Sequence, residues 1–233
     1  QNILVSLITA LGAVMLPKIS YALKNEGQEN FENMIRKSFE FIIISAIPMC
    51  FLIMILSKEL ILVLAGRDYL AAVPVLQFLL PSLIFIGLSS VTAWQLLIPL
   101  GKEKFTVIGA LAGVIVNLIF NFLMIPSLGG IGAAIASTLA ELAVLSVHLK
   151  VLKEIVTRTL EMKEVFISLV STFVASGTLL LIKYNMVIEM NFFACVVYGV
   201  IFMGIYALSL LFFRERLASE TLYRLKAKIA RRV

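Results

Sequence analysis

The chain has 233 residues, of which 61% are hydrophobic and 15% are charged, and its formal net charge is +6. A soluble globular domain is about 45–50% apolar and needs a polar surface over its core, so this composition excludes a soluble fold. The charge alone would fit a nucleic-acid or a membrane partner, but the long apolar segments favour the membrane, and no nucleic-acid partner is expected.

Seven segments are apolar and long enough to cross a bilayer, which takes about 20 helical residues. In chain order they are residues 3–23, 38–56, 71–99, 105–126, 130–149, 165–182 and 192–213. Pro81 lies near the middle of the third segment and is expected to kink it. The sequence therefore predicts an all-α integral membrane protein with about seven transmembrane helices. Because Gln1 stands directly before an apolar segment, we also expect upstream residues to be missing.

The distribution of lysine and arginine predicts the orientation. Of the 20 such residues, Lys58, Arg67 and Lys183 fall on one side of the predicted membrane, and the other 17 fall on the opposite side. Basic loops remain in the cytoplasm, so the C-terminus is predicted to be cytoplasmic. The basic tail, residues 214–233, is either an amphipathic helix on the cytoplasmic leaflet or a solvated tail.

Four residues in the fourth segment follow one another at a spacing of four: Gly109, Gly113, Asn117 and Asn121. This spacing places them on one face of a helix. Glycines at this spacing allow a second helix to approach closely. The two amides either hydrogen-bond to that second helix or line a cavity for a polar substrate, and both interpretations stay open.

Glu141 stands in the middle of segment 130–149. A carboxylate at this depth costs about 3 kcal/mol to insert, so it is expected to face the bundle or a watery path. Ser137 and Thr138 lie one turn before it and His148 two turns after it, which gives this helix a polar face. Glu141 is either a site for a cation, a proton or a lipid headgroup, or a hydrogen-bonded structural residue.

Three further polar residues are candidates for ligand contact. Gln95 lies near the cytoplasmic end of the third segment and can hydrogen-bond a sugar hydroxyl or a neighbouring helix. Lys18 and Arg36 flank the first cytoplasmic loop, where fixed positive charge attracts phosphate. The orientation rule for basic residues explains Lys18 and Arg36 equally well.

Catalytic and metal chemistry find little support in the sequence. His148 is the one histidine, which excludes a histidine-based cluster within the chain. Cys50 and Cys195 both lie inside apolar segments and are expected to be buried thiols, not a disulfide. We therefore predict no catalytic residue, no metal and no cofactor.

Four motifs, in order, resemble a known family. They are LGAVMLPKIS at 11–20, PLGKEK at 99–104, NLIFN at 117–121 with Ile125 and Pro126, and GIGAAIAST at 130–138 with Glu141. These motifs resemble those of bacterial Wzx-type flippases of polysaccharide units (O-antigen or capsule type). That family belongs to the multidrug/oligosaccharidyl-lipid/polysaccharide exporter superfamily, whose MATE-like fold has two lobes.

The resemblance implies that residues 1–150 are helices of the second lobe and residues 151–213 are two additional transmembrane helices. It implies alternating-access transport of undecaprenyl-pyrophosphate-linked oligosaccharide across the bacterial cytoplasmic membrane. The expected partners are this lipid-linked substrate, membrane lipids, the missing N-terminal lobe, and a glycan polymerase and glycosyltransferases. The implied contacts to the sugar or a coupling ion are Asn117, Asn121, Gln95 and Glu141, and those to phosphate are Lys18 and Arg36.

Other functions remain as alternatives. Within the same superfamily, the chain could belong to a multidrug/cation antiporter or to a flippase of the peptidoglycan lipid precursor. A membrane-embedded enzyme of a glycan pathway and a purely structural membrane subunit are further alternatives. The short loops without acidic or histidine clusters argue against the enzyme.

Overall fold

The computed structural model describes residues 15–185, 192–213, 215, 216 and 218. Within these residues all regular structure is helical, and six helices are long and apolar enough to cross a membrane. This confirms the predicted all-α membrane fold. The first predicted segment lies mostly outside the described residues, and its remainder is helical over residues 15–25.

The helical elements follow the apolar segments in chain order. They are α2 Gln28–Ile55, α3 Ser57–Leu64, the 3-10 turn η1 Arg67–Tyr69, α4 Ala72–Leu79, α5 Ser82–Ser90, the π-helix η2 Val91–Leu97, α6 Lys104–Leu128, α7 Gly130–Val151, α8 Lys153–Thr159, α9 Met162–Asn185 and α10 Phe192–Phe212. The six spans are α2, the composite of α4, α5 and η2, and then α6, α7, α9 and α10.

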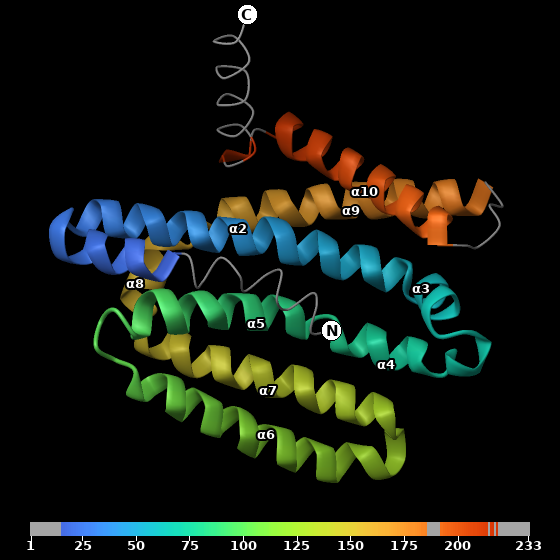
Figure 1. Cartoon of the computed structure of the whole chain (residues 1–233), viewed down its shortest axis with the longest axis horizontal. Coiled ribbons are helices and arrows are strands. Elements are labelled where there is room, and N and C mark those ends of the chain that lie inside the picture. Colours follow the sequence, from blue (N-terminus) through green and yellow to red (C-terminus); the bar gives the residue numbers. More distant parts are fainter. Residues whose placement is uncertain (1–14, 186–191, 214, 217, 219–233) are drawn as a thin grey trace, which may run out of the picture.

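The spans lie side by side in a row (Figure 1). The order across the row is α10, α9, α2, the composite span, α7 and α6, and the contacts between elements follow the same order. Two buried apolar clusters hold the row together. One joins α2 to α5, η2 and α8, and the other joins the C-terminal half of α2 to α9 and α10.

The composite span is broken at Pro81, as the sequence predicts. α4 ends at Leu79 and α5 begins at Ser82, because proline has no N–H to continue the helix. The Thr138 hydroxyl of α7 donates a hydrogen bond of 2.9 Å to the Phe78 carbonyl beside this break. A neighbouring helix thus binds a backbone group near the break, as membrane helices with internal proline require.

α6 and α7 form a tight hairpin. Gly129 alone separates them, and its φ of +54° is a backbone conformation that favours glycine. A Cβ on Gly109 would lie 2.8 Å from His148 Nε2, and one on Gly113 would lie 2.7 Å from Val144 Cγ2. Both glycines therefore allow α7 to approach closely, which confirms the interpretation of their spacing.

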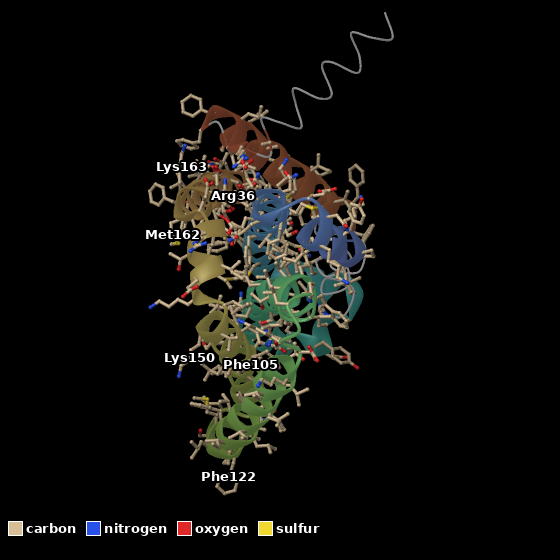
Figure 2. All side chains as sticks on the ribbon, turned by 90° about the vertical axis from the view of Figure 1, so that its left-hand side faces the viewer. Arg36, Phe105, Phe122, Lys150, Met162 and Lys163 are labelled. Carbon is tan, nitrogen blue, oxygen red and sulfur yellow. The ribbon has the colours of Figure 1, made fainter. Side chains whose placement is uncertain are left out.

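One end of the row carries most of the basic residues. It is the end at which α2, α6 and α9 begin, on the left in Figure 1, and we call it the basic end. Figure 2 looks onto this end and shows Arg36 and Lys163 on the same part of it. The structure thus places the basic loops at one end, as the sequence predicts. The orientation of this end towards the cytoplasm stays a prediction.

The last two spans pack on α2. The Tyr206 hydroxyl of α10 donates to the Ile44 carbonyl of α2 at 3.0 Å and lies 3.0 Å from the Ser168 hydroxyl of α9. At the opposite end, Lys183 Nζ lies 2.7 Å from Glu59 Oε1 of α3. α9 and α10 thus share a buried apolar cluster with the C-terminal half of α2, while the division of the chain at residue 150 stays a prediction.

Candidate functional site

A groove of about 620 Å³ opens between α5, η2 and α7, and we call it the α5–α7 groove. Its lining residues are Leu16, Ile86, Ser89, Ser90, Ala93, Trp94, Thr106, Glu141, Val144 and His148. Hydroxyl groups, one carboxyl and one imidazole thus face a space whose walls are otherwise apolar. Such a mixture of an apolar wall and a few convergent polar groups is typical of ligand sites.

The π-helix η2 forms part of this groove. Thr92 is fully buried, and its hydroxyl lies 3.0 Å from His148 Nδ1 of α7, within hydrogen-bonding distance. His148 is also buried, and its Nε2 has no hydrogen-bond partner. π-Helical turns inside transmembrane spans often mark functional sites, because they change which side chains a helix presents.

A second groove, of about 410 Å³, lies between α6 and α7 and shares Glu141 and Val144 with the first, and we call it the α6–α7 groove. Its lining residues are Ala110, Gly113, Val114, Asn117, Leu118, Ser137, Ala140, Glu141 and Val144. Asn121 Nδ2 donates a hydrogen bond of 2.8 Å to Asn117 Oδ1, so the two amides act as a pair along α6. Glu141 lines both grooves and stands between them.

The structure brings three of the six predicted contact residues together. Asn117 and Glu141 line the same groove, and Asn121 is hydrogen-bonded to Asn117. Asn121 Oδ1 is buried without a hydrogen-bond partner. Ser137 also lines this groove, whereas Thr138, placed by the sequence on the same polar face, turns towards Phe78.

The other three predicted residues lie elsewhere. Gln95 is 1% exposed, lines neither groove, and its Oε1 has no hydrogen-bond partner. Lys18 is exposed on the helical segment 15–25. Arg36 forms an ion pair of 3.1 Å with Glu161, so its guanidinium is already bound to a carboxylate.

Sequence reasoning missed several groove residues. The sequence does not mark Ser89, Ser90 or Trp94 as candidates for ligand contact. All three line the α5–α7 groove, and Trp94 is 52% exposed. Their proximity to Glu141 could not be predicted from the sequence, because 47 or more residues separate them from it.

The chemistry of the two grooves is polar binding. Carboxyl, hydroxyl and amide groups can hold water, an ion or a sugar hydroxyl within a membrane span, where such groups are costly and face cavities. Among the described residues, no group of three or more His, Cys, Asp or Glu side chains is arranged to hold a metal ion.

Within the described residues, six apolar spans with polar grooves between them define a multi-span membrane protein. The chain belongs to the lipid II flippase MurJ family, whose family model matches residues 2–201. This places it in the superfamily that the sequence motifs indicate.

Two similar proteins extend the comparison. An uncharacterized membrane protein, MJ1068, from Methanocaldococcus jannaschii is 26% identical over 210 residues, covering 90% of this chain and 41% of that protein. A solved structure of the lipid II flippase MurJ in an inward closed conformation has a TM-score of 0.78 and 19% identity, covering 93% of this chain and 45% of that one. The chain spans less than half the length of either protein. The similarity to the solved structure shows that the two chains share a fold.

The MurJ family is not the Wzx type of flippase that the sequence motifs resemble. The four motifs favour a Wzx-type flippase, with a flippase of the peptidoglycan lipid precursor as an alternative. The family match favours that alternative. Both types belong to one superfamily, which explains why shared motifs led to the right superfamily and to a different branch.

Proposed function

We propose that this chain forms part of a flippase that moves a lipid-linked peptidoglycan precursor of the lipid II type across the cytoplasmic membrane. Family membership supports the class of substrate. The observation that carries a role for this chain is the position of Glu141, which lines two polar grooves halfway along a membrane span.

The physical task is to move a large polar headgroup through about 30 Å of hydrocarbon. Asn117, Ser137 and Glu141 provide hydrogen-bonding groups within the bundle, at a depth where lipid provides none. These groups hold either the headgroup or a coupling ion while the two lobes of the whole protein alternate between conformations. Such transport needs only binding and release of the substrate, without a covalent step. We therefore propose a transport role for the chain and no enzymatic one.

The rest of a two-lobed protein is the expected partner, since the chain spans 41% of one relative and 45% of the similar structure. The basic end of the row is expected to face the cytoplasm, because basic loops are retained there. A second candidate substrate is an undecaprenyl-pyrophosphate-linked oligosaccharide, which is favoured by the four motifs shared with Wzx-type flippases.

The test is a flipping assay with the full-length gene product in proteoliposomes. Vesicles contain either a fluorescent lipid II analogue or a fluorescent lipid-linked oligosaccharide, and a membrane-impermeant quencher reports the headgroup in the outer leaflet over time. We expect protein-dependent flipping of the lipid II analogue and little flipping of the oligosaccharide. Flipping of the oligosaccharide alone would reverse the choice of substrate, and flipping of neither would contradict the proposal.

Variants then test the role of this chain. Glu141→Gln removes the charge but keeps the shape, and it is expected to lower the flipping rate about tenfold, the effect of losing roughly one charge-assisted hydrogen bond. Leu142→Ala is the control, because Leu142 is exposed on the same helix and lines neither groove. An unchanged rate in Glu141→Gln would remove Glu141 from the transport path.

A further inference from the structure

A strip of buried hydroxyl groups runs along α9, the helix that lies between α10 and α2 in the row (Figure 1). One face of α9 carries Ser168, Ser171, Thr172 and Ser176, because residues three, four and eight positions apart stand on the same side of a helix. The first three side chains are fully buried, and Ser176 is 7% exposed. We call these four residues the α9 hydroxyl strip, and they line neither of the two grooves.

The helix α10 adds two hydroxyl groups to the same interface. Tyr198 and Tyr206 are eight residues apart, so they share one face of α10, and both are buried. The Tyr206 hydroxyl lies 3.0 Å from Ser168 Oγ, which gives the register of the two helices. Because α10 runs antiparallel to α9 (Figure 1), the position eight residues before Tyr206 is level with the position eight residues after Ser168. Tyr198 therefore stands at about the level of Ser176.

Most of these hydroxyl groups have no hydrogen-bond partner. Tyr206 donates to the Ile44 carbonyl of α2 at 3.0 Å, and Ser168 is within hydrogen-bonding distance of Tyr206. The other four hydroxyl oxygens are buried without a hydrogen-bond partner among the described residues, and they are those of Ser171, Thr172, Ser176 and Tyr198. Thr178, which lies on α9 outside the strip, instead donates to the Val174 carbonyl one turn earlier, at 2.9 Å. The four hydroxyl groups thus keep donor and acceptor capacity that the protein does not use.

Glu164 extends this polar face to the basic end of the row. It lies one turn before Ser168, it is 3% exposed, and its Oε2 has no hydrogen-bond partner among the described residues. The helix rises about 18 Å from Glu164 to Ser176, which is more than half of the roughly 30 Å of hydrocarbon. Buried polar groups with unused hydrogen-bonding capacity therefore extend from the start of α9 deep into the span.

We propose that the α9 hydroxyl strip binds a file of water molecules that enters from the basic end. A buried hydroxyl group without a hydrogen bond is costly in an apolar interior, so such groups are normally paired with protein or with ordered water. A buried water makes about three hydrogen bonds, and like a hydroxyl group it both donates and accepts. The strip carries no charge between Ser168 and Ser176, which favours water over an ion. The proposal does not depend on the transport function, because its readout is hydration.

Radiolytic footprinting of the full-length protein in lipid nanodiscs tests the proposal. A short X-ray pulse converts water, including bound water, to hydroxyl radicals, and mass spectrometry measures the oxidation of the side chains beside it. Tyr198 is the probe and Phe39 is the reference, since both aromatic side chains are at most 1% exposed and Phe39 lies in the other apolar cluster. We expect Tyr198 to be oxidised well above the level of Phe39. Equal, low oxidation of the two residues would overturn the proposal.

Thr172→Val and Thr178→Val form a matched pair, because they are the same change on the same helix, inside and outside the strip. Thr172 lies between the basic end and Tyr198, so loss of its hydroxyl group interrupts the file of water. Oxidation of Tyr198 is expected to fall about fivefold in Thr172→Val, the effect of losing one typical hydrogen bond, and to stay unchanged in Thr178→Val. Low oxidation of Phe39 in both variants reports an intact fold. Unchanged oxidation of Tyr198 in Thr172→Val, or equal losses in the two variants, would overturn the proposal.

Unfolding of the same variants gives a second readout with opposite signs for a wet and a dry strip. In a dry strip, Thr172→Val removes a hydroxyl group that has no hydrogen bond, and the variant is more stable than the wild type. In a wet strip it removes a hydrogen bond to water, and we expect the equilibrium constant of unfolding to rise about fivefold. A fall of that constant below the wild-type value would contradict bound water at the strip.

Discussion

Single glycines set how closely α6 and α7 approach. A Cβ on Gly132 would lie 2.6 Å from the carbonyl carbon of Met124, a backbone atom that cannot move aside cheaply. We expect Gly132→Ala to lower the free energy of unfolding by about 1–3 kcal/mol, as overpacking does. Unfolding in a detergent titration measures the change.

Gly177→Ala is the matched control for that substitution. Nothing lies within 4 Å of a Cβ added to Gly177, in the middle of α9, and alanine favours a helix more than glycine does. Stability is therefore expected to stay equal or to rise. Equal effects of the two substitutions would contradict the close packing of α6 against α7.

A second residue-scale prediction concerns the ion pair between Lys183 and Glu59. The atoms Nζ and Oε1 lie 2.7 Å apart, and the side chains are 19% and 11% exposed. Each of Lys183→Met and Glu59→Gln leaves one buried polar group without its partner. A double-mutant cycle on the free energy of unfolding is expected to give a coupling of about 1–2 kcal/mol. Additive effects would show that the two groups do not interact.

Some residue roles could be predicted from the sequence and others could not. The spacing of Gly109 and Gly113 predicted a close helix contact, and the mid-span position of Glu141 predicted a group facing inward. The pairing of Arg36 with Glu161 could not be predicted, because it joins positions 125 residues apart. Such pairs depend on which helices become neighbours, and local periodicity carries no information about that.

At the scale of elements, apolar segments predicted the spans closely. Segment 130–149 became α7, Gly130–Val151, and segment 192–213 became α10, Phe192–Phe212. α2 begins ten residues before its apolar segment, since a helix continues into the polar region beyond the hydrocarbon. The π-helix η2, Val91–Leu97, was not predicted from the sequence.

The contact between η2 and α7 gives a prediction at this scale. Thr92→Val keeps the shape of the side chain but leaves His148 Nδ1 buried without its partner. We expect a loss of about 1–3 kcal/mol in unfolding free energy, together with slower flipping. Thr178→Val is the control, because Thr178 Oγ1 is exposed and donates only within its own helix, to Val174. A loss no greater than that of the control would contradict a structural link between η2 and α7.

At the scale of the whole molecule, the two ends of the row predict its orientation. In a full-length variant without native cysteines, Lys24→Cys is expected to react with an impermeant maleimide only from the cytoplasm. A cysteine at Arg67, which is exposed at the opposite end, is expected to react only from outside. Reaction of both positions from one side would contradict the predicted topology.

The sequence predicted the membrane fold and the superfamily, but not the branch within it. Motifs such as GIGAAIAST serve helix packing, as Gly132 shows by its approach to Met124. Packing requirements are shared by transporters with different substrates, so these motifs carry fold information more than substrate information. Substrate identity depends on polar residues such as Glu141, whose neighbours are known only from the fold.

The polar grooves within the bundle are expected to admit water at membrane depth. Reaction of Ser90→Cys with a charged, membrane-impermeant thiol reagent tests this most directly, in a full-length protein from which all native cysteines, Cys50 and Cys195 included, have been removed. Ser90 lines the α5–α7 groove, whereas Val200 is 67% exposed on α10 and lines neither groove. We expect Ser90→Cys to react, and we expect Val200→Cys, at an exposed position that lines neither groove, not to react. Equal protection of both cysteines would show that the groove excludes water, and it would contradict a polar path within the bundle.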